Sequence, residues 1–157
     1  MTIQVEKITQ QRFEKYGRVV LYPQEKPLAE EPEYKFWSDL ANYQIEGETE
    51  IGICTVYRQS PPEISTVERH LHTPEILIPV DAPFVLPLLL QDDPAEEMRA
   101  FEVGIGEAVV VDAGVWHGAS LPVGVEQSSY FVIFKRGTPA NDVEKKAISG
   151  VRVELEE

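Results

Sequence analysis

Short apolar or alternating segments recur along this 157-residue chain and are separated by Pro and Gly. Alternation of apolar and polar residues predicts half-buried strands, and short continuous apolar runs predict fully buried strands. The strands expected on this basis are residues 19–21, 51–58, 67–72, 76–80, 84–90, 99–103, 108–111, 129–135 and 151–155. Many short strands joined by Pro- and Gly-rich turns are typical of an all-β sandwich or barrel.

The remaining segments are short or irregular. One helix is expected over Thr9–Tyr16, where a Thr N-cap begins the segment and Gly17 follows as a stop signal. The acidic, Pro-rich segment Gln24–Tyr34 predicts an exposed loop. Residues 35–42 fit either a strand or a helical turn.

We expect one domain over residues 1–157, because the length suits one domain and no repeat is visible. Its core is predicted to lie at roughly residues 13–136. Residues 137–157 are predicted to form a polar C-terminal tail, of which the last dozen residues are loosely held.

The chain is acidic, with 14 basic and 27 acidic residues and a formal net charge of −13. This balance argues against nucleic-acid and anionic-membrane partners, which both require clustered Lys and Arg. The charged N-terminal segment lacks the apolar region of a signal peptide, and no run reaches the ~20 apolar residues of a membrane span. Because Cys54 is the single cysteine, a disulfide scaffold is excluded and a cytoplasmic location is expected.

All three histidines lie in two short phrases. In RHLHTPE, His70 and His72 are two residues apart, so a strand would present both imidazoles on one face. Glu75 follows a Thr-Pro turn that can bring its carboxylate back to them. The second phrase, GEAVVVDAGVWHG, ends with His117. From the residues alone, these histidines are either metal ligands or strand residues with ordinary hydrogen bonds.

The two phrases resemble the two motifs of the cupin superfamily. The second phrase matches position by position, as Gly, five residues, Asp, one residue, Gly, two residues and His. The first has fewer residues than usual between its second His and the Glu. The resemblance implies a cupin-type β-barrel (double-stranded β-helix or jelly roll) and a divalent Zn, Mn, Ni or Fe ion. Its ligands would be His70, His72, Glu75 and His117. Such a site keeps open positions, as a catalytic metal needs.

Further phrases resemble the ureidoglycolate lyase family. They are YGRVV at 16–20, TVYRQSPP at 55–62, ERH at 68–70, ILIPVDAPF at 76–84, RAF at 99–101, GVWH at 114–117 and NDVE at 141–144. The resemblance implies cleavage of ureidoglycolate to glyoxylate and urea in purine and allantoin breakdown. Two departures are visible. Gly118 stands where the family has a second His, and the family tends to have Gln at position 75 and no His at position 72.

A small anionic substrate requires local positive charge in such an acidic protein. Beside the metal, the candidate substrate-binding residues are Arg58, Arg69, Arg99 and Trp116. Lys135 is the candidate catalytic acid or base, because it ends a strong strand and a desolvated lysine works near neutral pH. The alternative for each cation is a solvated surface charge, and for Trp116 a core aromatic.

Two other functions stay open at this stage. Complete cupin motifs also fit a metal-dependent sugar or keto-acid isomerase, and the fold alone fits a non-catalytic protein that binds a small acid. An open barrel exposes sheet edges, which dimerisation commonly covers. We therefore expect a homodimer.

Overall fold

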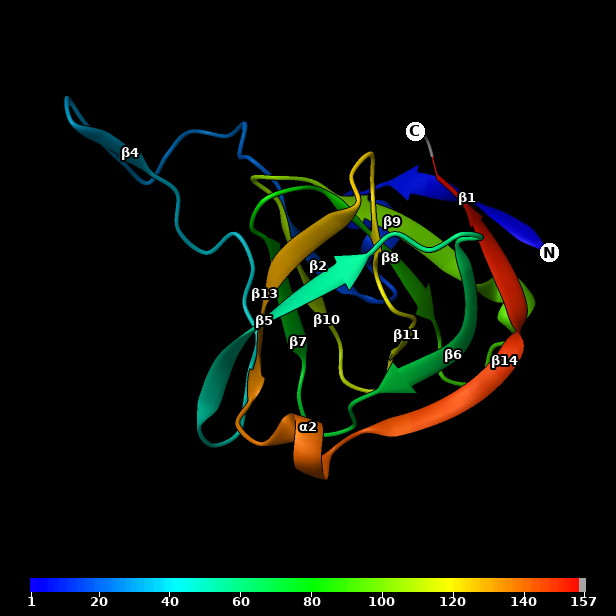
Figure 1. The fold of residues 1–157 in the computed structure, drawn as a ribbon. Coiled ribbons are helices and arrows are strands. Elements are labelled where there is room, and N and C mark those ends of the chain that lie inside the picture. The colour runs from blue at the N-terminus through cyan, green and yellow to red at the C-terminus, as the bar shows by residue number, and fades with distance from the viewer. Residues whose placement is uncertain (156–157) are drawn as a thin grey trace.

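The computed structural model describes residues 1–155, which form two β-sheets curved around a common interior (Figure 1). The strands are β1 (Thr2–Lys7), β2 (Gly17–Val20), β3 (Ala29–Glu31), β4 (Tyr34–Phe36), β5 (Thr49–Tyr57), β6 (Glu63–Arg69), β7 (Glu75–Pro79), β8 (Phe84–Leu89), β9 (Arg99–Val103), β10 (Ala108–Val111), β11 (Trp116–His117), β12 (Leu121–Pro122), β13 (Gln127–Lys135) and β14 (Glu144–Glu154). The helices are α1 (Gln10–Phe13), α2 (Thr138–Asn141) and the 3₁₀ turn η1 (Ala95–Glu97). The predicted all-β barrel is confirmed. Among residues 1–155, no helix is long and apolar enough to cross a bilayer.

The barrel is built from two sheets, of which the seven-stranded one is mixed and the five-stranded one is antiparallel. One sheet has seven strands in the order β11-β6-β14-β1-β9-β8-β12, and the other has five in the order β2-β10-β7-β13-β5. Strand alternation directs every second side chain inward. The interior of the barrel is therefore filled by apolar residues of both sheets, with Phe84 and Phe101 fully buried among them.

The predicted helix over Thr9–Tyr16 is present but shorter. The Thr9 hydroxyl caps it by accepting a hydrogen bond from the Arg12 backbone N–H at 3.1 Å. The helix then ends at Phe13, whose ring packs edge-on against Phe101 at 5.3 Å between centroids. Helix α1 thus serves to insert one aromatic ring into the barrel.

The prediction of a core limited to residues 13–136 is wrong at both ends. Strand β14, placed in the predicted tail, lies between β6 and β1 in the seven-stranded sheet. It pairs antiparallel with β6 and parallel with β1, and β1 in turn pairs parallel with β9. Strands β1 and β14 carry so many polar residues that their local pattern resembles that of exposed loops. Their pairing partners are far away in the sequence, so no local signal predicts the pairing.

The predicted loop at residues 24–34 is also partly wrong, because this region forms an arm that projects from the barrel (Figure 1). We use "the arm" for residues 22–43. It contains the two-stranded sheet of β3 and β4, with Lys35 Nζ 3.6 Å from Glu30 Oε1. The Trp37 indole donates to the Glu25 carbonyl at 2.8 Å. Of residues 35–42, only the first two continue the strand β4, and no helix forms there.

Candidate metal centre

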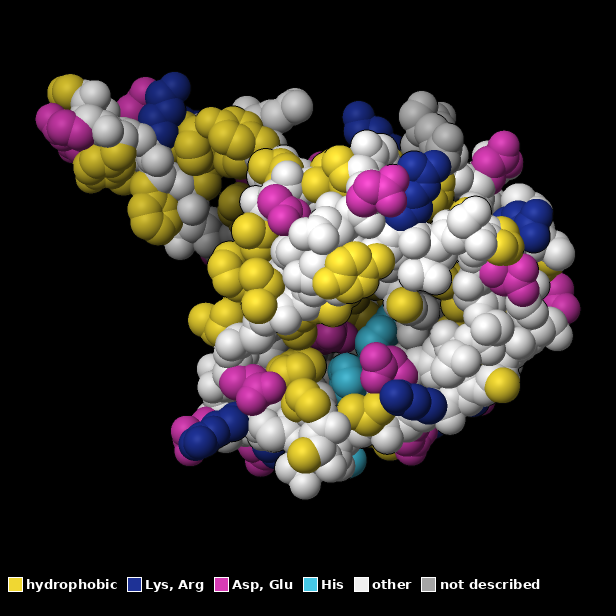
Figure 2. Space-filling view, in the orientation of Figure 1, with side chains coloured by type: hydrophobic (Ala, Val, Ile, Leu, Met, Phe, Trp, Pro, Cys, Tyr) yellow, Lys and Arg dark blue, Asp and Glu magenta, His cyan; other side chains and the backbone are white. Residues whose placement is uncertain are grey.

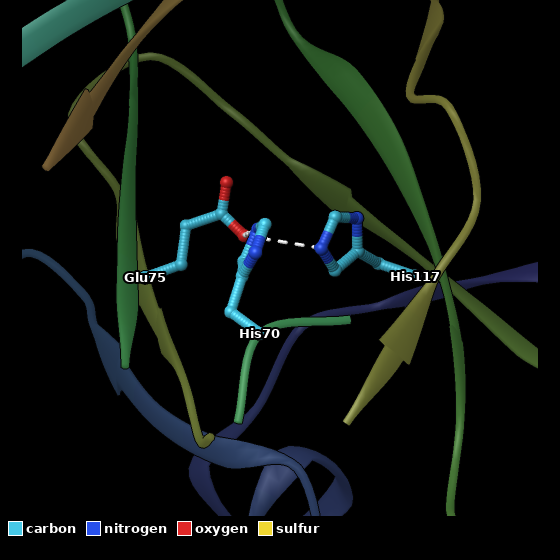
Figure 3. Close-up of side chains that lie close together, drawn as sticks. All are labelled: His70, Glu75 and His117. Atoms are coloured by element: carbon cyan, nitrogen blue, oxygen red, sulfur yellow. Dashed lines mark ion pairs between the residues drawn. The ribbon is translucent and has the colours of Figure 1, made fainter. Parts of the chain in front are cut away.

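Three side chains converge inside the barrel: His70, Glu75 and His117 (Figure 3). Oε2 of Glu75 lies 3.5 Å from Nε2 of His70 and 3.2 Å from Nε2 of His117. One ligand atom from each residue lies within 4.8 Å of the other two. The side chains are only 7%, 11% and 12% exposed, respectively. Two imidazoles and one carboxylate in this arrangement form a candidate site for a divalent metal.

Each of the three residues comes from a strand end. His70 follows the last residue of β6, Glu75 begins β7 and His117 ends β11. Strand β11 pairs with both β6 and β8, so it places His117 opposite Glu68 of β6. The turn before β11 is also bound to the first phrase, because the Gly114 N–H donates to the His70 carbonyl at 2.7 Å.

This turn explains the glycine at position 114. Its φ of +85° lies in the left-handed region, which glycine adopts at little cost. The two sequence phrases are thus held together by backbone contacts as well as by their side chains.

The prediction that His72 shares a face with His70 is wrong. Strand β6 ends at Arg69, so the two-residue period of a strand does not extend to position 72. The His72 side chain is 73% exposed, and its Nδ1 lies 3.2 Å from Oδ1 of Asp142. The structure brings together His70, Glu75 and His117, and leaves His72 outside.

Asp142 holds His70 in position. Its carboxylate accepts hydrogen bonds from the backbone N–H groups of Leu71 at 3.0 Å and His72 at 2.9 Å. Its backbone carbonyl lies 2.8 Å from Nδ1 of His70. A carbonyl only accepts, so Nδ1 carries the proton in this contact and Nε2 is left to face Glu75. Metal-binding histidines are typically oriented by such a contact.

Charge interactions within the cluster shift two pKa values. Burial alone would lower the pKa of His70, but the contact with the Glu75 carboxylate outweighs burial and raises it. Burial alone would raise the pKa of Glu75, but His117 and His70 together lower it. In the metal-free protein, the charged forms of His70 and Glu75 therefore stabilise each other.

An unpartnered nitrogen indicates that the cluster fits a cation. Nε2 of His117 is buried and has no hydrogen-bond partner among residues 1–155, because the nearby Glu75 oxygen is not aligned for a hydrogen bond. A buried polar atom without a partner is costly. Coordination of a cation between His117, His70 and Glu75 would use this lone pair.

The cluster lies in the wall of a cavity of about 550 Å³ that opens to the surface (Figure 2). Its apolar lining comes from the inner faces of β5, β7, β8 and β13. The polar lining residues beside the cluster are Glu50, Glu68, Ser120, Tyr130 and Lys145. Burial raises the pKa of the Tyr130 phenol, so this hydroxyl stays protonated and can donate a hydrogen bond into the cavity.

Two predicted substrate-binding residues, Arg58 and Arg99, and the predicted catalytic residue Lys135 lie outside the cavity. Arg58 follows β5 and pairs with Glu126 at 3.4 Å. Arg99 makes two hydrogen bonds of 2.8 and 2.7 Å to the Glu6 carboxylate. Lys135 lies at the end of β13 at an odd position, whereas the cavity-lining residues of this strand are at even positions. None of the three lines the cavity.

Arg69 and Trp116 also stay outside the cavity, because strand neighbours point to opposite faces. The Arg69 guanidinium lies 4.3 Å from the centre of the Trp116 ring and bonds Glu144 at 2.8 Å. The Trp116 indole donates to the Gln91 carbonyl at 3.2 Å. These contacts pack behind β11, next to His117. Neither of these two predicted substrate contacts therefore lines the cavity.

Sequence reasoning missed Lys145, which is the one cationic residue among the cavity-lining residues within the described range 1–155. It lies directly opposite Glu68 in the β6–β14 pairing. No local signal marks it, since it belongs to a Glu-Lys-Lys run that reads as exposed charge.

Steric crowding explains why position 118 is a glycine. A Cβ at this position would lie 2.7 Å from Cγ2 of Ile64 and 3.4 Å from Cβ of Pro87. The neighbours would have to move before a side chain, such as the family's second His, fitted there.

The geometry therefore defines a β-barrel with a buried His/His/Glu cluster in an internal cavity. Comparison with known proteins gives its family: the family model "Ureidoglycolate lyase" matches residues 1–155. The chain belongs to the ureidoglycolate lyase family, which confirms the resemblance in the sequence. It is 28% identical over 113 residues to ureidoglycolate lyase of Chelativorans sp. (strain BNC1), covering 68% of this chain and 67% of that protein. It is 29% identical over 115 residues to ureidoglycolate lyase 2 of Rhizobium meliloti (strain 1021), covering 69% of each.

Among solved structures, the chain is similar to oxalate decarboxylase. The Bacillus subtilis enzyme superposes with a TM-score of 0.42 and 21% identity over 72% of this chain and 33% of the enzyme. A second oxalate decarboxylase structure gives a TM-score of 0.43 and 20% identity over 55% of this chain and 21% of the other. The chain thus spans a third or less of those proteins.

Proposed function

We propose that this chain is a metal-assisted lyase that cleaves ureidoglycolate to glyoxylate and urea. The observation that carries the proposal is the buried cluster of His70, Glu75 and His117 in the wall of a substrate-sized cavity. The family and the relatives named ureidoglycolate lyase support the reaction.

The three residues of the cluster would hold a divalent Zn, Mn, Ni or Fe ion, for which imidazole and carboxylate are suitable ligands. A bound divalent cation supplies positive charge beside an anionic substrate and lowers the pKa of a hydroxyl group that it contacts. With three protein ligands, positions stay open for the substrate.

The cavity lining explains why this charge is needed. Glu50, Glu68 and Glu75 face the cavity, and Lys145 is the one cation among the described lining residues. Without a cation in the cluster, the lining carries more negative than positive charge and would repel a carboxylate substrate. Lys145, at the cavity wall, is the side chain placed to pair with the substrate carboxylate.

The reaction needs a hydroxyl proton removed and a leaving nitrogen protonated. As the substrate hydroxyl loses its proton, its oxygen forms the aldehyde carbonyl of glyoxylate, the carbon–nitrogen bond breaks and the urea nitrogen takes up a proton. Tyr130, protonated and buried in the cavity wall, is placed to donate a hydrogen bond to the ureido group. This contact would orient the leaving group.

The test is turnover of ureidoglycolate by chelator-treated protein before and after addition of each of the four metals, with urea and glyoxylate both quantified. We expect equal amounts of both products in the metal-loaded sample only. His117→Asn should abolish the reaction, whereas Glu50→Gln, a cavity residue outside the cluster, should retain it. Absence of turnover with every metal would overturn the proposal, and binding without turnover would favour a small-acid-binding protein.

A further inference from the structure

Gly52 lies in the middle of the nine-residue strand β5, where a glycine is unfavourable. Glycine weakens a strand because it loses more backbone freedom on folding than other residues and has no side chain to pack. Inside a strand it typically marks a bulge, the close approach of another backbone or the approach of a ligand. The surroundings of Gly52 decide between these three reasons.

A bulge and a close backbone approach are both excluded at Gly52. The register pairs each of the nine residues of β5 with one residue of β13, without a shift. A Cβ on Gly52 would meet no heavy atom of a non-neighbouring residue within 4 Å, whereas a Cβ on Gly118 would lie 2.7 Å from Ile64. The chain has ten glycines, all within the described residues 1–155, and Gly52 alone combines such open space with a φ outside the left-handed region. Neither the backbone nor the packing therefore requires a glycine at this position.

The open space over Gly52 belongs to the cavity. Gly52 is directly opposite Val132 of β13, and Val132 is directly opposite Leu77 of β7. Directly opposite residues point to the same face of a sheet, and these three all line the cavity. Strand β7 also carries Glu75, which lies two residues before Leu77 on the same face. Gly52 is therefore two strands, or roughly 10 Å, across the cavity wall from the strand that carries the metal-ligand carboxylate.

The neighbours of this space suit an uncharged group. The inward-facing residues beside Gly52 are Glu50, Cys54 and Tyr130, and none of them is positively charged. The protonated Tyr130 hydroxyl can donate a hydrogen bond to a carbonyl oxygen. The cationic lining residue Lys145 lies on β14, in the other sheet. An acid with a planar amide group at its other end would therefore place the amide end, and not the carboxylate, over Gly52.

We infer that the open space over Gly52 is the subsite for the ureido end of the substrate, and that the missing side chain sets the size of the group that fits there. The inference rests on the proposed function. The metal cluster and Lys145 bind the hydroxy-acid end, while the planar ureido group lies on the bare backbone of β5 beside Tyr130. Strand stability is thus lower than it would be with a side chain at position 52, and substrate gains the room.

Gly52→Ala and Gly52→Val test the subsite by calorimetry of the Zn²⁺-loaded protein with two acids that it does not cleave. N-carbamoylglycine carries the ureido group but no hydroxyl, and glycolate carries the carboxylate and the hydroxyl but no ureido group. One methylene too many in a pocket changes recognition about 10–200-fold. We expect the dissociation constant of N-carbamoylglycine to rise about tenfold in Gly52→Ala and at least ~100-fold in Gly52→Val. The affinities for glycolate and Zn²⁺ should not change.

The matched control is Ile51→Phe, which adds bulk to the neighbouring position of the same strand. Ile51 is 70% exposed and directly opposite Ile133, so it points away from the cavity. This variant should bind both acids as the unmodified chain does.

Urea unfolding gives a second readout, which a purely structural role of Gly52 would move in the opposite direction. Ala and Val fit the open space and the ordinary backbone conformation, and Val also favours strands. Both Gly52 variants should therefore be at least as stable as the unmodified chain while they lose the ureido acid. A glycine required for folding would make both variants less stable.

Equal losses of affinity for the two acids would overturn the inference, because they would indicate damage to the whole cavity. Unchanged binding of N-carbamoylglycine in Gly52→Val would overturn it as well. Turnover of ureidoglycolate is measured separately on the unmodified chain. If turnover is absent with every metal but Gly52→Val loses only the ureido acid, the proposed function fails and the ureido subsite stands.

Discussion

Replacement of Glu75 by Gln tests the candidate metal centre most directly. The change preserves the size of the side chain and removes the one negative charge of the cluster. Oε2 of Glu75 lies 3.5 Å from Nε2 of His70 and 3.2 Å from Nε2 of His117. Loss of a residue that only orients a ligand lowers metal affinity about 10–100-fold. Loss of a ligand should lower metal affinity at least about 100-fold, which is about 2.8 kcal/mol at about 1.4 kcal/mol per tenfold.

Isothermal titration calorimetry with Zn²⁺ near neutral pH measures this loss, and the visible absorption of the Co²⁺ form reports the ligand set. Glu50→Gln is the matched control, because Glu50 lines the same cavity but lies outside the three-residue cluster. The Zn²⁺ affinity of this variant should stay within about threefold of that of the unmodified chain, because a charge without direct contact to the metal contributes below ~1 kcal/mol. Unchanged affinity in Glu75→Gln, or equal losses in both variants, would refute the assignment.

The stability difference between the unmodified chain and Glu75→Gln should depend on pH in the metal-free protein. Because the pKa of Glu75 is lowered, its stabilising effect is present above ~4.3, the unfolded value, and is lost as pH falls through the folded value. Because the pKa of His70 is raised, its effect is present below ~6.5 and is lost as pH rises through the folded value. The advantage of the unmodified chain over Glu75→Gln in urea unfolding should therefore be largest between these values and shrink on either side. An advantage that does not vary with pH would contradict the ion pair.

Three further substitutions test the surroundings of the cluster. Asp142→Ala should weaken metal binding about 10–100-fold, because it releases the loop that orients His70. The control His72→Ala changes an exposed side chain and should leave metal binding unchanged. Equal Co²⁺ spectra and equal metal affinities in the two variants would contradict this role of Asp142. Lys145→Met should raise KM for ureidoglycolate more than it lowers kcat, as steady-state kinetics would show, and an unchanged KM would exclude a contact with the substrate carboxylate. Gly118→Ala should lower the free energy of unfolding by about 1–3 kcal/mol, because the added methyl group overpacks against Ile64. In an Ile64→Ala background this loss of stability should be smaller. Equal losses in both backgrounds would rule out the clash.

The fold class and the three residues of the cluster could be predicted from local sequence patterns. Strand alternation and Pro and Gly turns are local signals, and they placed β7, β8, β9, β10 and β13 to within a few residues. His70, Glu75 and His117 were found because each lies in a short phrase whose turn residues fix the local backbone. The family was visible for the same reason, since its phrases are short and occur in order.

Which charged residues face the cavity depends on long-range strand pairing and could not be predicted from local patterns. His72 was expected beside His70, but β6 ends one residue before His70 and the chain turns away. Lys145 reaches the cavity because β14 pairs with β6 across about 75 residues of sequence, a register that no local pattern encodes. The predicted arginines have the right charge, but their strand positions direct them to Glu6, Glu126 and Glu144.

The same distinction applies to the ends of the chain and to strands β5 and β13. Strands β1 and β14 are stabilised by parallel and long-range pairing, so their polar residues resemble those of a tail until their partners are known. Strands β5 and β13 were visible in the sequence only as strands with apolar residues on both faces. Which of these faces borders the cavity depends on how the two sheets close into a barrel, because closure alone assigns an inside and an outside.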